Sequence, residues 1–211
     1  MISSLKRLAF FFCLIPFCQL AYRAYTQDLG ANPIETITHF TGSWSLFILL
    51  ASLSVTPVRR VTGWNDLVKF RRMLGLFAFF YAMLHFSTYI VLDLYFDFAA
   101  IAKDILKRPY ITVGFSAFVL LIPLAMTSTS GMIRRLGKRW QQLHSLVYLI
   151  AILGVVHFYW LVKSDITRPA QYGLVLALLL GFRLYHRWFA APASHRSKAP
   201  AITTPRKDQV A

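Results

Sequence analysis

The sequence has few cysteines and few acidic residues, and both shortages exclude some classes of protein. Its only two cysteines, Cys13 and Cys18, lie together in one early apolar run, so the chain has no long-range disulfide framework. It has 8 acidic residues against 23 lysines and arginines, which gives a formal net charge of +15. We also find no glycine-rich nucleotide-binding loop of either common type and no internal repeat. Neither a disulfide scaffold nor a nucleotide-binding domain is therefore expected.

Apolar residues dominate instead. They make up 57% of the 211 residues, and the mean hydropathy is +0.53. This is too apolar for an ordinary soluble domain of that size. The positive charge would attract any polyanion, but the basic residues lie between apolar runs rather than on an amphipathic surface. A lipid bilayer therefore explains the composition better than nucleic acid, which we do not expect as a partner.

Six apolar segments have roughly the length needed to cross a bilayer. They cover residues 8–25, 40–57, 73–92, 110–127, 143–162 and 171–189. The first segment runs to Tyr25 without a convincing cleavage site, which favours a helix over a secretory signal. The sequence thus predicts an all-α integral membrane protein, a six-transmembrane-helix bundle over residues 1–189. The polar, proline-containing segment 190–211 is expected to be a disordered basic tail.

The orientation follows from the lysines and arginines of alternate connections. The two termini together with segments 59–72 and 134–139 hold 17 of the 23 basic residues, whereas six of the eight acids lie on the opposite side. Because basic residues accumulate on the cytoplasmic side, both termini are predicted to be cytoplasmic, and three loops to face outward.

Three of the six histidines have ordinary explanations. His39 opens the second apolar segment, and His186 and His195 belong to the end of the sixth segment and the tail. A histidine at a membrane interface is most often solvated or hydrogen-bonded.

The other three, His85, His144 and His157, lie within apolar segments. An ionisable group inside a membrane is costly and usually has a partner and a function. His85 and His157 are predicted at similar depth near the outer side, where two neutral imidazoles are able to hold a b-type haem iron axially. His144 precedes His157 by thirteen residues, about 20 Å along a helix, and points to a second, inner haem.

This arrangement is incomplete by geometry alone. Thirteen residues turn an ideal helix by about 220°, so His144 and His157 do not share one face unless the helix bends, for instance at Gly154. Arg71 and Arg72 stand where the third segment would need a fourth ligand. Structural hydrogen bonding and a proton pathway remain alternatives for these histidines.

Five blocks of the sequence resemble the MsrQ family (also called YedZ), the haem-binding membrane subunits of bacterial periplasmic methionine sulfoxide reductase systems. The longest block is TSTSGMIRRLGKRWQQLHSLVYLIAILGVVHFYWLVKSD, at residues 127–165. The others are GANPIETITHFTG at 30–42, RRMLGL at 71–76, LHFSTY at 84–89 and KRPYITVG at 107–114. Together they span nearly the whole chain except its ends, in the same order, and the family is similar to the membrane cores of ferric reductases and NADPH oxidases.

The resemblance implies an electron-transfer subunit of the bacterial inner membrane rather than a catalytic subunit. It implies one or two haem b groups with His85, His144 and His157 as axial ligands, and an associated FMN for which no segment provides a site. The donor would be a cytosolic flavin reductase or the quinone pool, since the chain has no appended FAD/NADPH domain. The implied acceptor is MsrP, a periplasmic molybdopterin enzyme that reduces methionine sulfoxide in oxidised proteins.

Other functions remain open on the sequence alone. A ferric or cupric reductase would keep the haems and change only the acceptor. A haem-free transporter or proton channel would use the histidines for ion passage, and a purely structural subunit would not need them. The basic segments 59–72 and 134–139 are suited to haem propionates, to FMN phosphate or to an acidic reductase surface, but topology alone also explains them. The acidic loop with Asp93, Asp97 and Asp104 would either meet the acceptor or be simply solvated.

Overall fold

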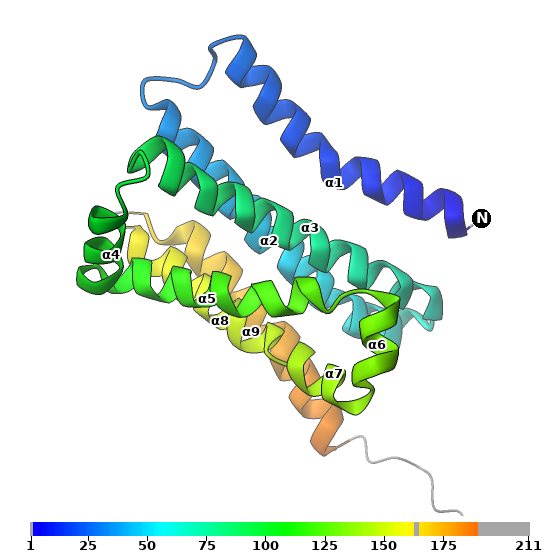
Figure 1. Cartoon of the computed structure of the whole chain (residues 1–211). Helices are drawn as coiled ribbons and strands as arrows, with labels where there is room; N and C mark the ends of the chain where they lie inside the picture. The colour runs from blue at the N-terminus through cyan, green and yellow to red at the C-terminus, as the bar shows by residue number, and fades with distance from the viewer. Residues whose placement is uncertain (1, 163–164, 190–211) are drawn as a thin grey trace, which may run out of the picture.

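All regular structure in the described residues, 2–162 and 165–189 of a computed structural model, is helical (Figure 1). The long helices are α1 (Ile2–Tyr25), α2 (Pro33–Thr62), α3 (Val68–Thr88), α5 (Pro109–Met126), α8 (Val147–Leu161) and α9 (Thr167–Trp188). Shorter elements are η1 (Asn65–Leu67), the π-helical turn η2 (Tyr89–Asp93), α4 (Phe98–Lys107), α6 (Ser130–Leu136) and α7 (Lys138–His144). The tail predicted over 190–211, with His195, lies outside the described residues.

Each of the six predicted apolar segments lies mainly within one long helix. Within residues 2–162 and 165–189, five stretches are long and apolar enough to cross a membrane: Ile2–Tyr25, Pro33–Thr62, Asn65–Asp93, Pro109–Met126 and Lys138–Leu161. Helix α9 is not among them, because polar residues such as Gln171 and Arg183 interrupt its apolar run. The structure therefore confirms an all-helical membrane protein and leaves the sixth span as a prediction.

The fifth predicted segment is not one continuous helix. Helix α7 ends at His144 and α8 begins at Val147, so the regular α-helix is interrupted immediately after His144. Helix α8, in contrast, continues through Gly154. The interruption lies at residues 145 and 146, and not at the glycine that the sequence offered as a bend. The predicted segment 73–92 includes most of η2, whose π-helical form was not predicted. The short helices α4 and α6 and most of α7 were not predicted, because none of them contains a long apolar run.

Two helix hairpins form the body of the bundle, with α9 against them (Figure 1). Helices α2 and α3 make one hairpin, and Ser45 Oγ and Ser52 Oγ of α2 donate to the backbone carbonyls of Ala78 and Arg71 on α3, at 3.0 and 3.3 Å. Helices α5 and α8 make the second. The start of α2, the end of α3, α4 and the start of α5 gather at one end of the bundle, here called the α4 end; α6 and α7 lie at the opposite, α7 end (Figure 1).

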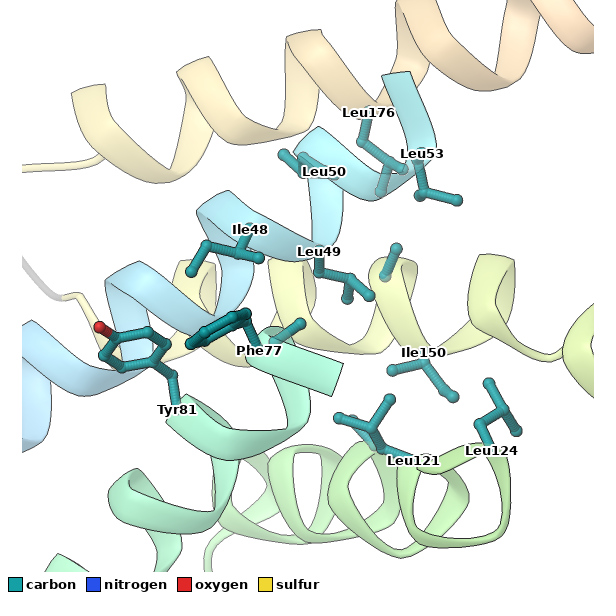
Figure 2. Close-up of a cluster of buried hydrophobic side chains, with 13 residues drawn as sticks. Ile48, Leu49, Leu50, Leu53, Phe77, Tyr81, Leu121, Leu124, Ile150 and Leu176 are labelled. Atoms are coloured by element: carbon teal, nitrogen blue, oxygen red, sulfur yellow. The ribbon is translucent and has the colours of Figure 1, made fainter. Parts of the chain in front are cut away.

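The buried cluster joins both hairpins to α9 (Figure 2). Its members are Ile48, Leu49, Leu50, Leu53, Phe77, Ala78, Tyr81, Ala117, Leu121, Leu124, Ile150, Ala151 and Leu176. Helix α1 contributes none of them and packs at the edge of the bundle against α3, through ring pairs such as Phe10 with Phe77. The fold thus places the hairpins α2–α3 and α5–α8 face to face, with the histidine-bearing helices α3 and α8 in different hairpins.

Candidate functional site

A cavity of about 300 Å³ lies between the two hairpins towards the α4 end. Residues of α2, α3, α5 and α8 form its walls, and Ile105 of α4 reaches it. Most of its lining is apolar, as is typical of cofactor sites. His85 and His157 both line it.

The two imidazoles approach each other across this cavity. The ring centroids of His85 and His157 are 6.1 Å apart, and the ring planes are inclined by 78°. A metal ion midway between two imidazoles, with each metal–nitrogen bond roughly 2.0 Å long, separates the ring centroids by about 6 Å. The pair therefore has the spacing of two axial ligands.

Backbone carbonyls fix which nitrogen of each ring is free. His85 Nδ1 lies 2.9 Å from the carbonyl oxygen of Thr38 on α2, and His157 Nδ1 lies 2.7 Å from that of Tyr110 on α5. A carbonyl oxygen only accepts hydrogen bonds, so each Nδ1 must carry the proton and donate. In both neutral rings the lone pair is therefore left on Nε2, and a hydrogen bond of this kind orients a metal-ligating histidine.

Beside each histidine ring lies a glycine, whose missing side chain leaves space for the ring. Gly42 is four residues after Thr38, and a Cβ there would lie 3.0 Å from Cε1 and Nδ1 of His85. Gly114 is four residues after Tyr110, and a Cβ there would lie 2.6 Å from His157 Nδ1. Each histidine follows its carbonyl partner by 47 residues, so the two hairpins repeat one local arrangement. The sequence blocks 30–42 and 107–114 contain these four supporting residues, but nothing in either block identifies their role.

Two imidazoles suit a metal that already has other ligands. Among the described residues no group of three or more histidine, cysteine, aspartate or glutamate side chains is placed to hold a bare metal ion. A porphyrin supplies four nitrogens in a plane and needs only two axial ligands from the protein. The donor set, the ring spacing and the glycine clearances all fit haem b.

Polar groups gather where the cavity meets the α4 end. Tyr89, Asp93, Arg108 and Tyr110 line this part, together with the exposed His39. The hydroxyl of Tyr89 is buried and has no hydrogen-bond partner among the described residues. Contacts with the Tyr110 hydroxyl and the Asp104 carboxylate raise the pKa of Arg108 above its ordinary value, so this guanidinium stays cationic.

His144 does not join the pair and does not line the cavity. It lies at the α7 end, with its ring stacked on Trp140 at 3.9 Å between centroids. Its Nε2 is 3.0 Å from Thr127 Oγ1, whose own proton goes to the carbonyl oxygen of Pro123 at 2.6 Å. His144 Nε2 therefore donates, and no second imidazole faces this ring among the described residues. The arrangement does not present a bis-imidazole site at this end.

The remaining predicted positions have local contacts. His186 packs against Phe182 in α9, at 4.4 Å between centroids and away from the cavity. Asp97 caps α4 by accepting from the Ala100 N–H at 2.9 Å, and Asp104 pairs with Arg108 at 3.4 Å. Two of the three acids in the predicted outer loop thus have structural roles.

The sequence is similar to a known protein family and to known proteins. Residues 40–155 match the family model described as ferric reductase like transmembrane component. The chain is 53% identical over 190 residues to the protein-methionine-sulfoxide reductase heme-binding subunit MsrQ of Herminiimonas arsenicoxydans, covering 89% of this chain and 87% of that relative. It is 53% identical over 181 residues to the protein of the same name from Xanthomonas campestris pv. campestris (strain 8004), covering 86% and 83%. No solved structure matches the chain.

Proposed function

Because the chain belongs to the MsrQ family, within the ferric reductase-like membrane proteins, we propose that it carries electrons through haem b across the bacterial inner membrane. The acceptor in this proposal is MsrP, a periplasmic molybdopterin enzyme that reduces methionine sulfoxide in oxidised proteins. The chain would then be an electron-transfer subunit, with catalysis located in its partner.

One observation carries the proposal: the paired imidazoles of His85 and His157, 6.1 Å between ring centroids, with both Nε2 lone pairs left free. A structural hydrogen bond needs only one carbonyl for each histidine and does not require the two rings to share a tautomer. Axial ligation of one iron does, because both rings must present Nε2 to it.

The chain's own residues would position and shield the site. The carbonyl groups of Thr38 and Tyr110 hold the imidazole rings at a fixed angle, and Gly42 and Gly114 let them approach the neighbouring helices. When bound, haem b supplies one-electron chemistry. If both His85 and His157 bound the iron, they would suit the group to electron transfer better than to oxygen activation.

The reaction of the periplasmic acceptor determines how many electrons the chain must deliver. Reduction of one methionine sulfoxide consumes two electrons and two protons and yields the thioether and water. A cytosolic flavin reductase or a membrane quinol would provide the electrons, passed on one at a time. With both termini cytoplasmic and α9 as the sixth span, the cavity at the α4 end would lie near the periplasmic face, close to the acceptor.

His144 remains a proposed ligand of a second haem. Its place at the α7 end would set that haem on the donor side of the membrane. Ligation would require His144 to give up its contact with Thr127 or to bind through Nδ1, and the second axial ligand has no assigned residue. FMN, which the family resemblance implies, likewise stays a prediction without an assigned site.

Absorption spectra and haem counts per polypeptide test the proposal. The proteins to compare are detergent-purified wild type and the variants His85→Ala, His157→Ala, His144→Ala and His186→Ala, all expressed with ample haem. We expect the first two variants to lose the cavity haem, and the control His186→Ala to keep it, because His186 does not touch the cavity. His144→Ala should lower the haem count only if a second haem binds at the α7 end.

A wild-type protein without haem under these conditions would contradict the proposal and favour a transporter, a proton channel or a structural role. Normal haem content with electron transfer to ferric or cupric ions, but not to the periplasmic reductase, would change only the acceptor. Reconstitution of the reduced protein with each acceptor in turn separates these cases.

A further inference from the structure

The charged residues that line the cavity lie at its α4 end. The ligand assigned to that end here rests on the proposed function. We propose that the two carboxylates of haem b lie at the α4 end of the cavity, where the Tyr89 hydroxyl and the Arg108 guanidinium hold them. The porphyrin would thus enter in a single orientation, with its apolar edge towards the middle of the bundle.

The lining of the cavity changes along its length. Towards the middle of the bundle it is formed by residues of the buried core, namely Leu49, Ala117, Leu121 and Ile150. At the α4 end it also includes residues with hydroxyl, imidazole, carboxylate or guanidinium groups, beside apolar ones such as Ile105. A ligand that matches this wall needs a large apolar body with anionic groups on one edge.

Tyr89 provides an unused donor at that edge. Its hydroxyl is buried and has no partner among the described residues. A buried polar group without a hydrogen bond is costly, and such groups in a binding cavity are usually satisfied by what the cavity binds. A carboxylate oxygen is an acceptor that a tyrosine hydroxyl satisfies directly.

Arg108 provides a cation at the same edge. Its Nη1 lies 3.4 Å from both Asp104 Oδ2 and Tyr110 Oη. A guanidinium has five N–H donors, so these two long contacts leave donors for a bidentate contact with a carboxylate. Asp93 also lines the cavity, and both it and Arg108 are exposed to solvent. Solvent therefore screens the repulsion by Asp93 and the attraction by Arg108 alike, so direct hydrogen bonds from the guanidinium, rather than its charge at a distance, favour carboxylates at this edge.

The opposite orientation is excluded by desolvation. Carboxylates placed among Leu49, Leu121 and Ile150 would be buried without a donor, since these side chains offer none. Burial of an unpaired charge is far more costly than any packing gained by turning the porphyrin round.

Reconstitution with a charged and an uncharged ligand tests this directly. Full-length protein without haem, from haem-deficient cells, is placed in nanodiscs and loaded with haem b or with its dimethyl ester, in which both carboxylates are masked. The rate of ligand loss to an excess of a haem-scavenging apoprotein is then measured. The proteins are wild type, Tyr89→Phe, Arg108→Gln and Arg108→Lys, with Lys107→Gln as the control, an exposed cation next to Arg108 that does not line the cavity.

We expect Tyr89→Phe and Arg108→Gln to lose haem b roughly tenfold faster than wild type, because each removes a hydrogen bond to a charged group. Neither should change the loss of the ester, Arg108→Lys should recover part of the effect, and Lys107→Gln should change neither rate. Equal acceleration for both ligands, or for neither, would overturn the inference while leaving the haem function intact. Failure of wild type to bind haem b would instead defeat the proposed function.

Discussion

A neutral imidazole has a proton on one ring nitrogen and a lone pair on the other. The hydrogen-bond partner of the protonated nitrogen determines which nitrogen keeps the lone pair. The carbonyl oxygens of Thr38 and Tyr110 make the same choice for His85 and His157. The Thr127 hydroxyl makes the opposite choice for His144, whose Nε2 donates. Three histidines that look alike in the sequence therefore fall into a pair and a single residue.

Alanine at the two glycines is expected to affect haem binding unequally. In Gly114→Ala the new Cβ would lie 2.6 Å from His157 Nδ1, so the ring must move and its hydrogen bond to Tyr110 must lengthen. We expect roughly tenfold weaker haem binding, the lower end of the effect of losing a partner of a metal-ligating histidine. Gly42→Ala, at 3.0 Å from the His85 ring, should have a smaller effect.

Haem titration of the apoprotein and the low-spin ferric signal in electron paramagnetic resonance would measure both variants. Gly181→Ala in α9 is the matched control, because a Cβ there meets nothing within 4 Å. Equal affinities for Gly114→Ala and Gly181→Ala would show that the His157 ring does not need this clearance.

Prolines set the contacts between elements in this bundle. Pro16 interrupts α1, and Tyr81 of α3 enters the gap: its hydroxyl accepts from the Phe17 N–H at 3.0 Å and donates to the Cys13 carbonyl oxygen at 2.8 Å. A side chain inserted into the helix ladder in this way is a recognised cause of a kink. One buried hydroxyl thus adds to the ring pairs that hold the edge helix α1 against α3.

A second proline, Pro57 of α2, allows a hydrogen bond between α2 and α9. Pro57 of α2 has no N–H, so the carbonyl oxygen of Leu53 lacks its helical donor. Arg183 of α9 supplies one, with Nη2 at 2.6 Å from that oxygen, while Nη1 donates to the Tyr148 hydroxyl of α8 at 2.7 Å. The arginine that lowers the hydropathy of α9 therefore joins it to two other helices.

Removal of the Tyr81 hydroxyl should weaken the attachment of α1. In Tyr81→Phe the Phe17 N–H and the Cys13 carbonyl lose their shared partner, and we expect a loss of about 1–3 kcal/mol in the free energy of unfolding. Thermal unfolding in detergent measures it, with Tyr22→Phe as the control because Tyr22 is 69% exposed. A loss no larger than that of the control would mean that the hydroxyl does not hold α1 in place.

At the scale of the whole molecule, the two hairpins together form the candidate site, and the charge distribution predicts how the molecule is oriented in the membrane. Each hairpin contributes one histidine, one carbonyl and one glycine, so neither hairpin has a site alone. The N-terminal end of α1 and the C-terminal end of α9 lie towards the α7 end (Figure 1). The basic segments 59–72 and 134–139 belong to the same end, which the distribution of charge predicts to be cytoplasmic.

Labelling of single cysteines tests this orientation and the sixth span together. On a background of Cys13→Ser and Cys18→Ser, an impermeant maleimide should label Lys103→Cys and Arg168→Cys in intact spheroplasts. Lys138→Cys and Arg187→Cys should react only after the inner membrane is permeabilised. If Arg168→Cys and Arg187→Cys instead react from the same side, α9 does not cross the membrane.

The sequence by itself determined the helices and the family. Long apolar runs specify helices through local composition, and all six predicted segments are helical in the structure. The blocks around His85 and His157 were sufficient for the MsrQ family, which the comparisons confirm. Short helices such as α4 and α6 were not predicted because they contain no long apolar run.

Only the tertiary structure decided which histidines meet and what supports them. His85 and Thr38 are 47 residues apart, as are His157 and Tyr110, and their contacts exist only because each hairpin brings two helices together. The burial of the Tyr89 hydroxyl, which has no hydrogen-bond partner in the part of the chain that the structure describes, likewise depends on neighbouring helices. Hydropathy is a sum over adjacent residues, whereas the meeting of two imidazoles in one cavity depends on how helices pack, and no local pattern records that.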